Sequence, residues 1–426
     1  MKSLKSLRVL ALVLALAALA TSCSRSASSQ RGRTEPLRVG AIYPLSGTQG
    51  PGGVEEYRGV QIAANLANAG GGVAGQPIQL APVDVPAADA APGAVTALAG
   101  RGIGVVLGSY GSTISEPAAR TASERGLVFW ETGAVGELMG LERGAERVFR
   151  VAPGGALLGK TAMDFVSAQL LPKLHRDPAK LRYAVVAVDD QFGSAVARGA
   201  LDELRARGYS VAGSLRYDPR RYDKVKLVRQ IAATRPDVLF VVAYLDDGVA
   251  LRREIVRQDL KLVANIGTSS SYCMPAFGAA LGRDAVGLFA SDKPDAYGLN
   301  RKGLSPQARA ALEAADRAYE RAYHQEMSAA ALAGFAGAWA LFHWVLPRAG
   351  STDPEAVARA ARAVRVPAGG LPNGSGLEFG APGSPDAGVN LRAGSVIWEW
   401  VGIKDRQITW PPRFATAPLK AMRITP

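Results

Sequence analysis

The stretch from Val105 to Pro117 reads VVLGSYGSTISEP and predicts one complete strand–loop–helix unit. Its first three residues, Val105 to Leu107, are apolar and predict a short buried strand. A loop rich in glycine and hydroxyl groups follows, and Ser115 then suits the N-cap of a helix with Glu116 and Pro117 in its first turn. Such a loop points free N–H groups of a helix N-terminus at one spot. We therefore expect it to bind an anion such as a carboxylate.

The same alternation of strand and helix patterns continues along the chain. Strands are expected at 37–43, 78–83, 105–107, 127–130, 148–151, 183–188, 210–215, 238–243, 262–266, 286–290 and 396–400. Helices are expected at 54–68, 88–99, 115–122, 158–171, 194–207, 224–233, 249–258, 306–324, 329–346 and 354–363, and that at 329–346 is apolar enough to be buried. This pattern predicts an α/β protein with mostly parallel sheets that helices cover on both faces. The length of 426 residues favours two domains, with ligands at the carboxyl ends of the strands.

The N-terminus has the features of a secretory signal peptide. Lys2, Lys5 and Arg8 precede an apolar run from Val9 to Ala20, which is short for a membrane span, and Cys23 follows. Residues 1–23 resemble a bacterial lipoprotein signal, although Ala20 stands where Leu is usual, and the alternative is ordinary cleavage with an idle cysteine. We expect a lipid on Cys23, a flexible tether over 24–36, and a location in the periplasm or on the outer face of the cell membrane.

Charge and cysteine content narrow the possible partners. The net charge is +13, about +10 without the signal peptide, but the basic residues are scattered and form no run interleaved with aromatics. We therefore expect no nucleic acid partner and a solvated basic surface near anionic lipid. Cys273 is the one cysteine after the signal peptide, so we expect it to be a buried apolar residue rather than part of a disulfide or metal site.

Motifs of catalysis are missing from the sequence. Gly70 to Gly75 matches the dinucleotide fingerprint, but it follows a helix and precedes a strand, the reverse of the order that such a site needs. Neither a nucleophile elbow nor a phosphate-binding loop is present, and the three histidines have no metal-ligand spacing. Acidic pairs at Asp189–Asp190 and Asp246–Asp247 lack a partner base. We expect no enzyme activity, no cofactor and no metal.

Several short motifs resemble, in order and spacing, one family of proteins. They are Gly40–Ile42, Pro44–Gly47, Gly59, Ala63, Asn68, Gly71–Gly72, Gly75, Asp84, Gly108–Ser115, Pro117, Gln191–Gly193 and Pro236–Val238. The resemblance is to the leucine/isoleucine/valine-binding type of extracytoplasmic solute-binding proteins, which serve ABC transporters, and it runs from about Leu37 to Trp410. It implies capture of a small amino-acid-like, amide or carboxylate ligand and its delivery to a permease by a monomer. The alternative function is a ligand-sensing module that signals through a separate protein, and a hydrolase or transferase ranks third.

The resemblance also implies the fold, a periplasmic-binding fold of the first type with two lobes and three hinge crossings. The first lobe is expected to hold 37–152 and 287–388, and the second 153–286 and 389–412, with a C-terminal tail over 413–426. The crossings are expected near Ala152–Pro153, Val286 to Ala290 and Val389 to Ala393. Ligand binds between the lobes, which then close on it.

By position, the resemblance implies the residues that bind the ligand. Ser112 and Thr113 would hold a carboxylate, and Thr132 and Ala134 the backbone atoms of an amino acid. The remaining expected site residues lie at the entrance or on the second lobe, namely Tyr43, Leu45, Phe192, Tyr244, Asp246 and Ser269.

Two departures from the family pattern concern the ligand. Ala134 replaces a typical threonine, and Thr268 to Ser271 lacks the acid that amino-acid binders use for the ligand ammonium. A buried ammonium without a partner is costly, so Asp246 or Asp247 would have to replace that acid, or the ligand has no amino group.

Overall fold

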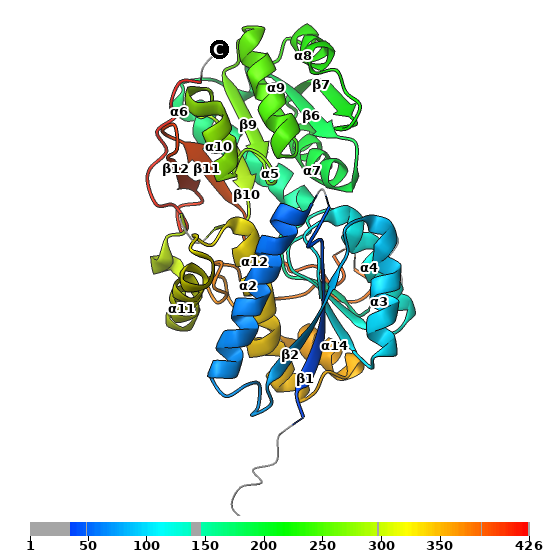
Figure 1. The fold of residues 1–426 in the computed structure, drawn as a ribbon. Helices are drawn as coiled ribbons and strands as arrows, with labels where there is room; N and C mark the ends of the chain where they lie inside the picture. Colours follow the sequence, from blue (N-terminus) through cyan, green and yellow to red (C-terminus); the bar gives the residue numbers. More distant parts are fainter. Residues whose placement is uncertain (1–34, 48, 138–145, 296–297, 385, 425–426) are drawn as a thin grey trace, which may run out of the picture.

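The computed structural model describes residues 35–424 except 48, 138–145, 296–297 and 385. Two lobes lie end to end, each built around one sheet (Figure 1). The first sheet has the order β2-β1-β3-β4-β5 and all its pairings are parallel. Its strands are β1 (Leu37–Tyr43), β2 (Ile78–Asp84), β3 (Val105–Gly108), β4 (Val128–Glu131) and β5 (Val148–Arg150).

The second sheet has seven strands in the order β12-β11-β10-β9-β8-β6-β7. They are β6 (Arg182–Val188), β7 (Ser210–Tyr217), β8 (Val238–Val242), β9 (Ala264–Thr268), β10 (Phe289–Asp292), β11 (Val396–Trp400) and β12 (Arg406–Trp410). The strands from β6 to β10 pair in parallel, whereas β11 pairs antiparallel with both β10 and β12. The two-lobed α/β fold expected from the sequence is therefore confirmed.

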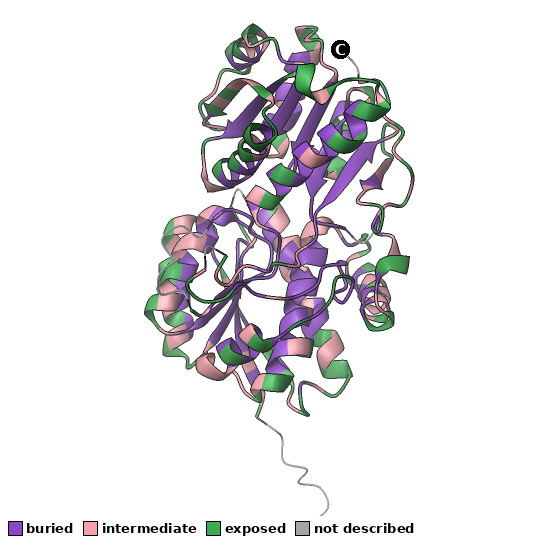
Figure 2. Ribbon diagram, turned by 180° about the vertical axis from the view of Figure 1, so that it is seen from behind, coloured by how far each residue is buried: buried purple, intermediate pink, exposed green. Residues whose placement is uncertain are grey.

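Helices cover both sheets, and Figure 2 shows the strands buried and the outer helix faces exposed. The first lobe has α2 (Gly50–Ala69), α3 (Ala91–Gly100), α4 (Ser112–Glu124), α11 (Pro306–Tyr323), α12 (Ala329–Ala340), α13 (Leu346–Ala349) and α14 (Pro354–Ala363). The second has α5 (Gly155–Phe165), α6 (Leu171–Lys173), α7 (Gln191–Ala206), α8 (Lys224–Ala233), α9 (Leu245–Arg257) and α10 (Pro275–Leu281). Side chains alternate on β3, so Val105 and Leu107 join one core cluster while Val106 joins the cluster of α3 and α4.

The most apolar helical segment is part of the core, as the sequence predicts. Among the described residues, Ala329–Ala349 is the one helical segment long and apolar enough to cross a membrane, and 72% of its most apolar window is buried. Its first part, α12, packs closely on α2. A Cβ at Gly59 of α2 would lie 1.9 Å from the Ala331 carbonyl oxygen. A Cβ at Gly334 of α12 would lie 2.0 Å from the backbone carbonyl oxygen of Glu56. Glycine is therefore what lets these two helices approach.

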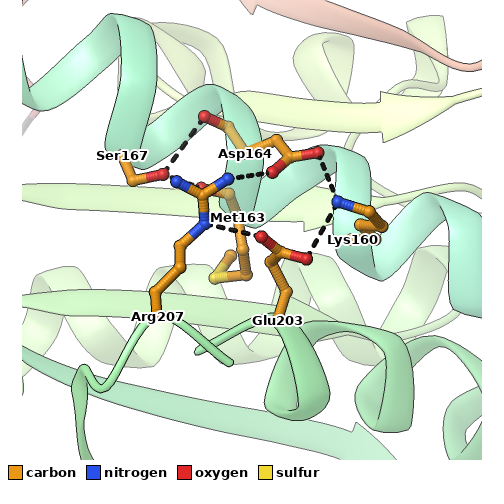
Figure 3. Close-up of polar contacts among 6 residues, drawn as sticks. All are labelled: Lys160, Met163, Asp164, Ser167, Glu203 and Arg207. Carbon is orange, nitrogen blue, oxygen red and sulfur yellow. Dashed lines mark hydrogen bonds and ion pairs between the residues drawn. The ribbon is translucent and has the colours of Figure 1, made fainter. Parts of the chain in front are cut away.

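In the second lobe α5 and α7 pack in the same manner, and ion pairs between their side chains link them at the surface. A Cβ at Gly159 would lie 2.1 Å from the Val196 carbonyl oxygen. Beside this contact, Figure 3 shows Lys160 between the carboxylates of Asp164 and Glu203, with both distances 2.9 Å. Arg207 pairs with the same two acids. Burial acts to raise the pKa of Glu203, but the hydrogen bonds from Lys160 and Arg207 lower it. The network holds the first helix of the second lobe against its neighbour.

One predicted crossing between the lobes is wrong. The prediction placed it at Val286 to Ala290, but Phe289 and Ala290 pair with β9 in the second sheet, so the chain crosses only after Asp292. The sequence pattern predicts a strand there, as the structure has it, but not the sheet to which that strand belongs, and β10 lies inside the second sheet between β9 and β11. The division of the other residues between the lobes stays a prediction.

The two other segments that connect the lobes lie side by side. The chain leaves β5 at Val151 and enters α5 at Gly155, and it enters β11 at Val396. Asn390 ties these segments together, because its Nδ2 donates to the carbonyl oxygens of Val151 at 3.1 Å and Gly376 at 2.9 Å.

The C-terminal segment is not a plain tail. β12 was missed by the sequence prediction, and beyond it the N–H groups of Lys420 and Ala421 donate to the Glu399 carboxylate on β11. The alternation of apolar and polar residues along β12 is weak, because β12 is an edge strand with partly exposed residues at both ends.

Candidate functional site

A narrow pocket that is partly open to solvent lies between the lobes, and we call it the inner pocket. It is lined by residues of the first lobe and of the second: Gln49, Tyr110, Gly111, Ser112, Gly133 and Val135, then Phe192, Tyr244, Ser269, Ser270 and Lys293. Most of them follow the carboxyl ends of parallel strands, where ligands of such sheets bind. The inner pocket therefore lies where the strand pattern predicts a site.

The helix after the VVLGSYGSTISEP strand begins earlier than predicted. α4 starts at Ser112, with Gly111 as N-cap, so Pro117 lies inside the helix instead of in its first turn. Ser115 does not cap it, because its hydroxyl donates to the buried Glu131 carboxylate instead. Ser112 thereby reaches the inner pocket, and its Oγ accepts from the Gly136 N–H at 2.9 Å.

Thr113, the other residue expected to hold a carboxylate, is half-buried and does not line the inner pocket. Its Oγ1 accepts a hydrogen bond from the Gln49 amide at 3.3 Å. Gln49 itself lines the pocket, and its buried Oε1 has no partner among the described residues.

The N–H groups near this loop already have an internal hydrogen-bond acceptor, which the sequence prediction missed. The carboxylate of Glu131, at the end of β4, accepts the N–H groups of Ser109, Gly133 and Ala134 at 3.2, 2.9 and 2.8 Å. Burial raises the pKa of Glu131 to about 8, while Arg150 acts to lower it. Part of the expected anion site is thus filled by the chain's own carboxylate.

Two more expected site residues, Thr132 and Ala134, face the interior of the first lobe. Thr132 Oγ1 lies 2.7 Å from the hydroxyl of Tyr43 and donates to Glu56 at 2.7 Å. Ala134 is 1% exposed, and its N–H is bonded to Glu131. Neither lines the inner pocket, because the loop after β4 turns inward to satisfy these buried carboxylates.

Tyr43 and Leu45 also lie away from the inner pocket. Tyr43 is fully buried, and burial with the nearby Glu56 raises the pKa of its hydroxyl. Leu45 is half-buried, and its N–H donates to the Asp84 carboxylate at 2.8 Å. Both therefore support the loop that follows β1 rather than the wall of the pocket.

On the second lobe, Phe192, Tyr244 and Ser269 line the inner pocket as the resemblance implies. The rings of Phe192 and Tyr244 have centroids 5.5 Å apart, and the Tyr244 hydroxyl donates to Asp190 at 2.6 Å. This hydrogen bond and aromatic contact fix both rings at the wall.

The acids considered as ammonium partners are not at the inner pocket. Asp246 is exposed in the first turn of α9, where a carboxylate stabilises the helix N-terminus. Asp247 is buried away from the pocket and accepts the Tyr217 hydroxyl and the Tyr244 N–H. The positions of these two acids do not support the expectation that one of them faces the ligand ammonium, which stays a prediction.

Lys293 is the main residue that the sequence prediction missed. It is 7% exposed, follows β10, and its Nζ donates to the Gly133 carbonyl oxygen of the first lobe at 2.8 Å. Among the described residues of the inner pocket, it is the one charged side chain. The sequence prediction missed Lys293 because it placed the crossing between the lobes too early. Lys293 lies beside the cleft because β10, which precedes it, is part of the second sheet.

In the part of the chain that the structure describes, no three His, Cys, Asp or Glu residues lie in a group that could hold a metal ion. Cys273 is buried and free, as predicted.

Comparison with known proteins identifies the family. A family model described as periplasmic binding protein matches residues 36–393. The chain belongs to the periplasmic binding protein family. Among curated proteins, Leu/Ile/Val-binding protein homolog 8 of Brucella abortus (strain 2308) is 28% identical over 348 residues, which cover 81% of this chain and 84% of that protein.

Solved structures of the same fold resemble this periplasmic binding protein over most of its length. The leucine binding protein LivK of Thermotoga maritima MSB8 has a TM-score of 0.70 at 18% identity, covering 87% of this chain and 97% of that one. A solute binding protein of an ABC transporter from R. palustris, solved with benzoate, has a TM-score of 0.68 at 18% identity, covering 91% and 99%. The predicted role, an exported solute-binding protein of the ABC-transporter type, is confirmed at this level.

Proposed function

We propose that this periplasmic binding protein captures a small carboxylate with an apolar or aromatic body in the inner pocket. The observation that carries the proposal is Lys293, a buried cation and the one charged side chain among the described residues of that pocket. One of its three donors is used by Gly133, so the others are available to a carboxylate. The Ser112 hydroxyl and the first N–H groups of α4 support the same anion.

The rest of the pocket suits the body of such a ligand. Phe192 and Tyr244 form an aromatic wall on the second lobe, and Val135 and Tyr110 lie on the first. The ligand would touch both lobes, and contacts to both stabilise the closed arrangement. The benzoate complex of the R. palustris relative supports this ligand class, since it shows that the fold accepts an aromatic carboxylate.

The cellular setting is part of the proposal. The chain would act as a monomer, held at the outer face of the cell membrane by a lipid on Cys23, and would deliver its ligand to an ABC transporter permease. Cys23 and the signal peptide lie outside the described residues. Mass spectrometry of the mature protein from membranes checks the lipid, because a free N-terminus beyond Cys23 would contradict it.

The ligand class is tested by binding. We expect benzoate or an aliphatic carboxylate to raise the melting temperature of the wild-type protein, since a ligand of the native state stabilises it. Lys293→Met should then weaken binding of that carboxylate about tenfold to a hundredfold, the value of a charge-assisted hydrogen bond. Isothermal titration calorimetry measures the affinity, with the exposed Lys404→Met as the matched control.

Two outcomes would contradict the proposal. One is a panel in which amides of the same acids bind as tightly as the acids, because an amide carries no charge for Lys293. The other is a Lys293→Met protein that folds and keeps wild-type affinity for the carboxylate.

A further inference from the structure

A second, larger pocket adjoins the inner pocket, and we call it the outer pocket. It has about 1280 Å³ of empty space, some of it open to solvent. Tyr110, Ser269, Ser270 and Lys293 line both pockets, so the two are continuous. The outer pocket is bounded by the segment between α11 and α12 on the first lobe and by residues after β9 and β10 on the second. A ligand longer than a branched-chain amino acid has room to extend into it.

The charge of the outer pocket is opposite to that of the inner one. Four carboxylates line it, from Glu55, Asp292, Asp295 and Glu326, against the cations of Lys293 and Arg406. Arg406 is paired with Asp295 at 2.6 Å, and both side chains are almost fully buried. A surplus of negative charge is left, which favours a cationic group in this pocket.

Asp292 is the carboxylate best placed to bind that group. It is 2% exposed, and its Oδ2 accepts the Cys273 thiol at 2.8 Å. Its Oδ1 is buried and has no hydrogen-bond partner among the described residues. Such an oxygen costs free energy unless a donor reaches it, and an ammonium group has the charge and the donors to do so. The charge and the backbone N–H of Lys293, the next residue, also act on the Asp292 carboxylate, while the Lys293 Nζ donates to Gly133.

We infer that the ligand is an amino carboxylate with well-separated charges, whose carboxylate lies at Lys293 and whose amine extends into the outer pocket to Asp292. This inference rests on the proposed function, because it places the carboxylate in the inner pocket. It also assigns a partner for a ligand ammonium, which the stretch Thr268 to Ser271 does not supply. An apolar body would pass Tyr110 and reach Met274 and Met327 at the outer wall.

The test compares pairs of carboxylates that differ only by an amine at the far end. The probes are 4-methylbenzoate with 4-(aminomethyl)benzoate, and hexanoate with 6-aminohexanoate, titrated into the wild-type protein. We expect the amine to tighten binding about tenfold in at least one pair, the value of one charge-assisted hydrogen bond. Asp292→Asn should remove that gain, so that the two members of each pair bind the variant with equal affinity. The exposed Asp246→Asn is the matched control and should keep the gain.

The outcomes separate this inference from the proposed function. Carboxylates that bind equally with and without the amine would overturn the inference and leave the proposed function standing. A gain that survives in Asp292→Asn would overturn the role of Asp292. A panel in which no carboxylate binds would overturn both. The wild-type comparison needs no variant, so it decides the ligand class even if Asp292→Asn fails to fold.

Discussion

At the scale of single residues, the buried carboxylate of Glu56 makes the first lobe sensitive to pH. Its Oε1 accepts the Thr132 hydroxyl, and its Oε2 has no partner among the described residues. Burial raises its pKa from 4.5 to about 7, although the charge of Lys293 acts to lower it. The folded state therefore holds a proton that the unfolded state has lost between these two pH values.

The expected result is a loss of stability as pH rises. The contribution of Glu56 is fully present below pH 4.5 and disappears as pH passes about 7, and its size is about 3 kcal/mol. Glu56→Gln stays neutral, so its free energy of unfolding should not fall over this range by that amount. Urea denaturation at several pH values measures it, with the exposed Glu124→Gln as control. Parallel pH profiles of Glu56→Gln and the wild type would contradict the prediction.

At single residues, the sequence predicts only those site positions that are determined by their place after a strand. Ser112, Phe192, Tyr244 and Ser269 follow strands directly, and they line the inner pocket. Thr132 also follows a strand, but it turns inward because Glu56 is buried beneath it, which a linear pattern does not reveal.

At the scale of elements, glycines determine how closely α2 and α12 pack. Gly59→Ala would place a methyl group 1.9 Å from the Ala331 carbonyl oxygen, so one helix has to move. We expect a loss of about 1–3 kcal/mol in the free energy of unfolding, the usual cost of overpacking. Gly93→Ala in α3 is the matched control, since its Cβ would meet nothing within 4 Å, and it should stabilise by about 0.5–1 kcal/mol. Urea denaturation compares them, and equal effects of the two substitutions would rule out this packing argument.

The elements themselves follow well from hydrophobic pattern. β1, α8 and α14 have the predicted bounds, because apolar periodicity and clear end residues agree there. The start of α4 and the strand β12 do not follow from it. A proline inside a helix and a half-exposed edge strand depend on tertiary contacts that outweigh local preference.

At the scale of the whole molecule, the two lobes also meet outside the pocket, where their contacts are polar. Arg198 of α7 in the second lobe pairs with Glu137, which follows β4 in the first lobe. Gln191 at the start of α7 donates to Glu116 of α4 at 3.4 Å. These contacts exist only while the lobes are close, so they contribute to the balance between the open and closed arrangements rather than to the stability of either lobe.

Reversing the charge of Arg198 should therefore shift the lobes toward opening and weaken ligand binding. Arg198 is half exposed, so the pair is worth about 0.2–1 kcal/mol, and Arg198→Glu should lower the affinity for a bound carboxylate by a factor of about 1.5 to 5. Because a surface pair is screened, the effect should shrink at high salt. Calorimetric titration at low and high salt measures it, and small-angle scattering reports the opening. Adding Glu137→Arg to Arg198→Glu restores opposite charges and should recover the affinity. If the double variant binds no better than Arg198→Glu alone, the pair does not help to hold the lobes closed.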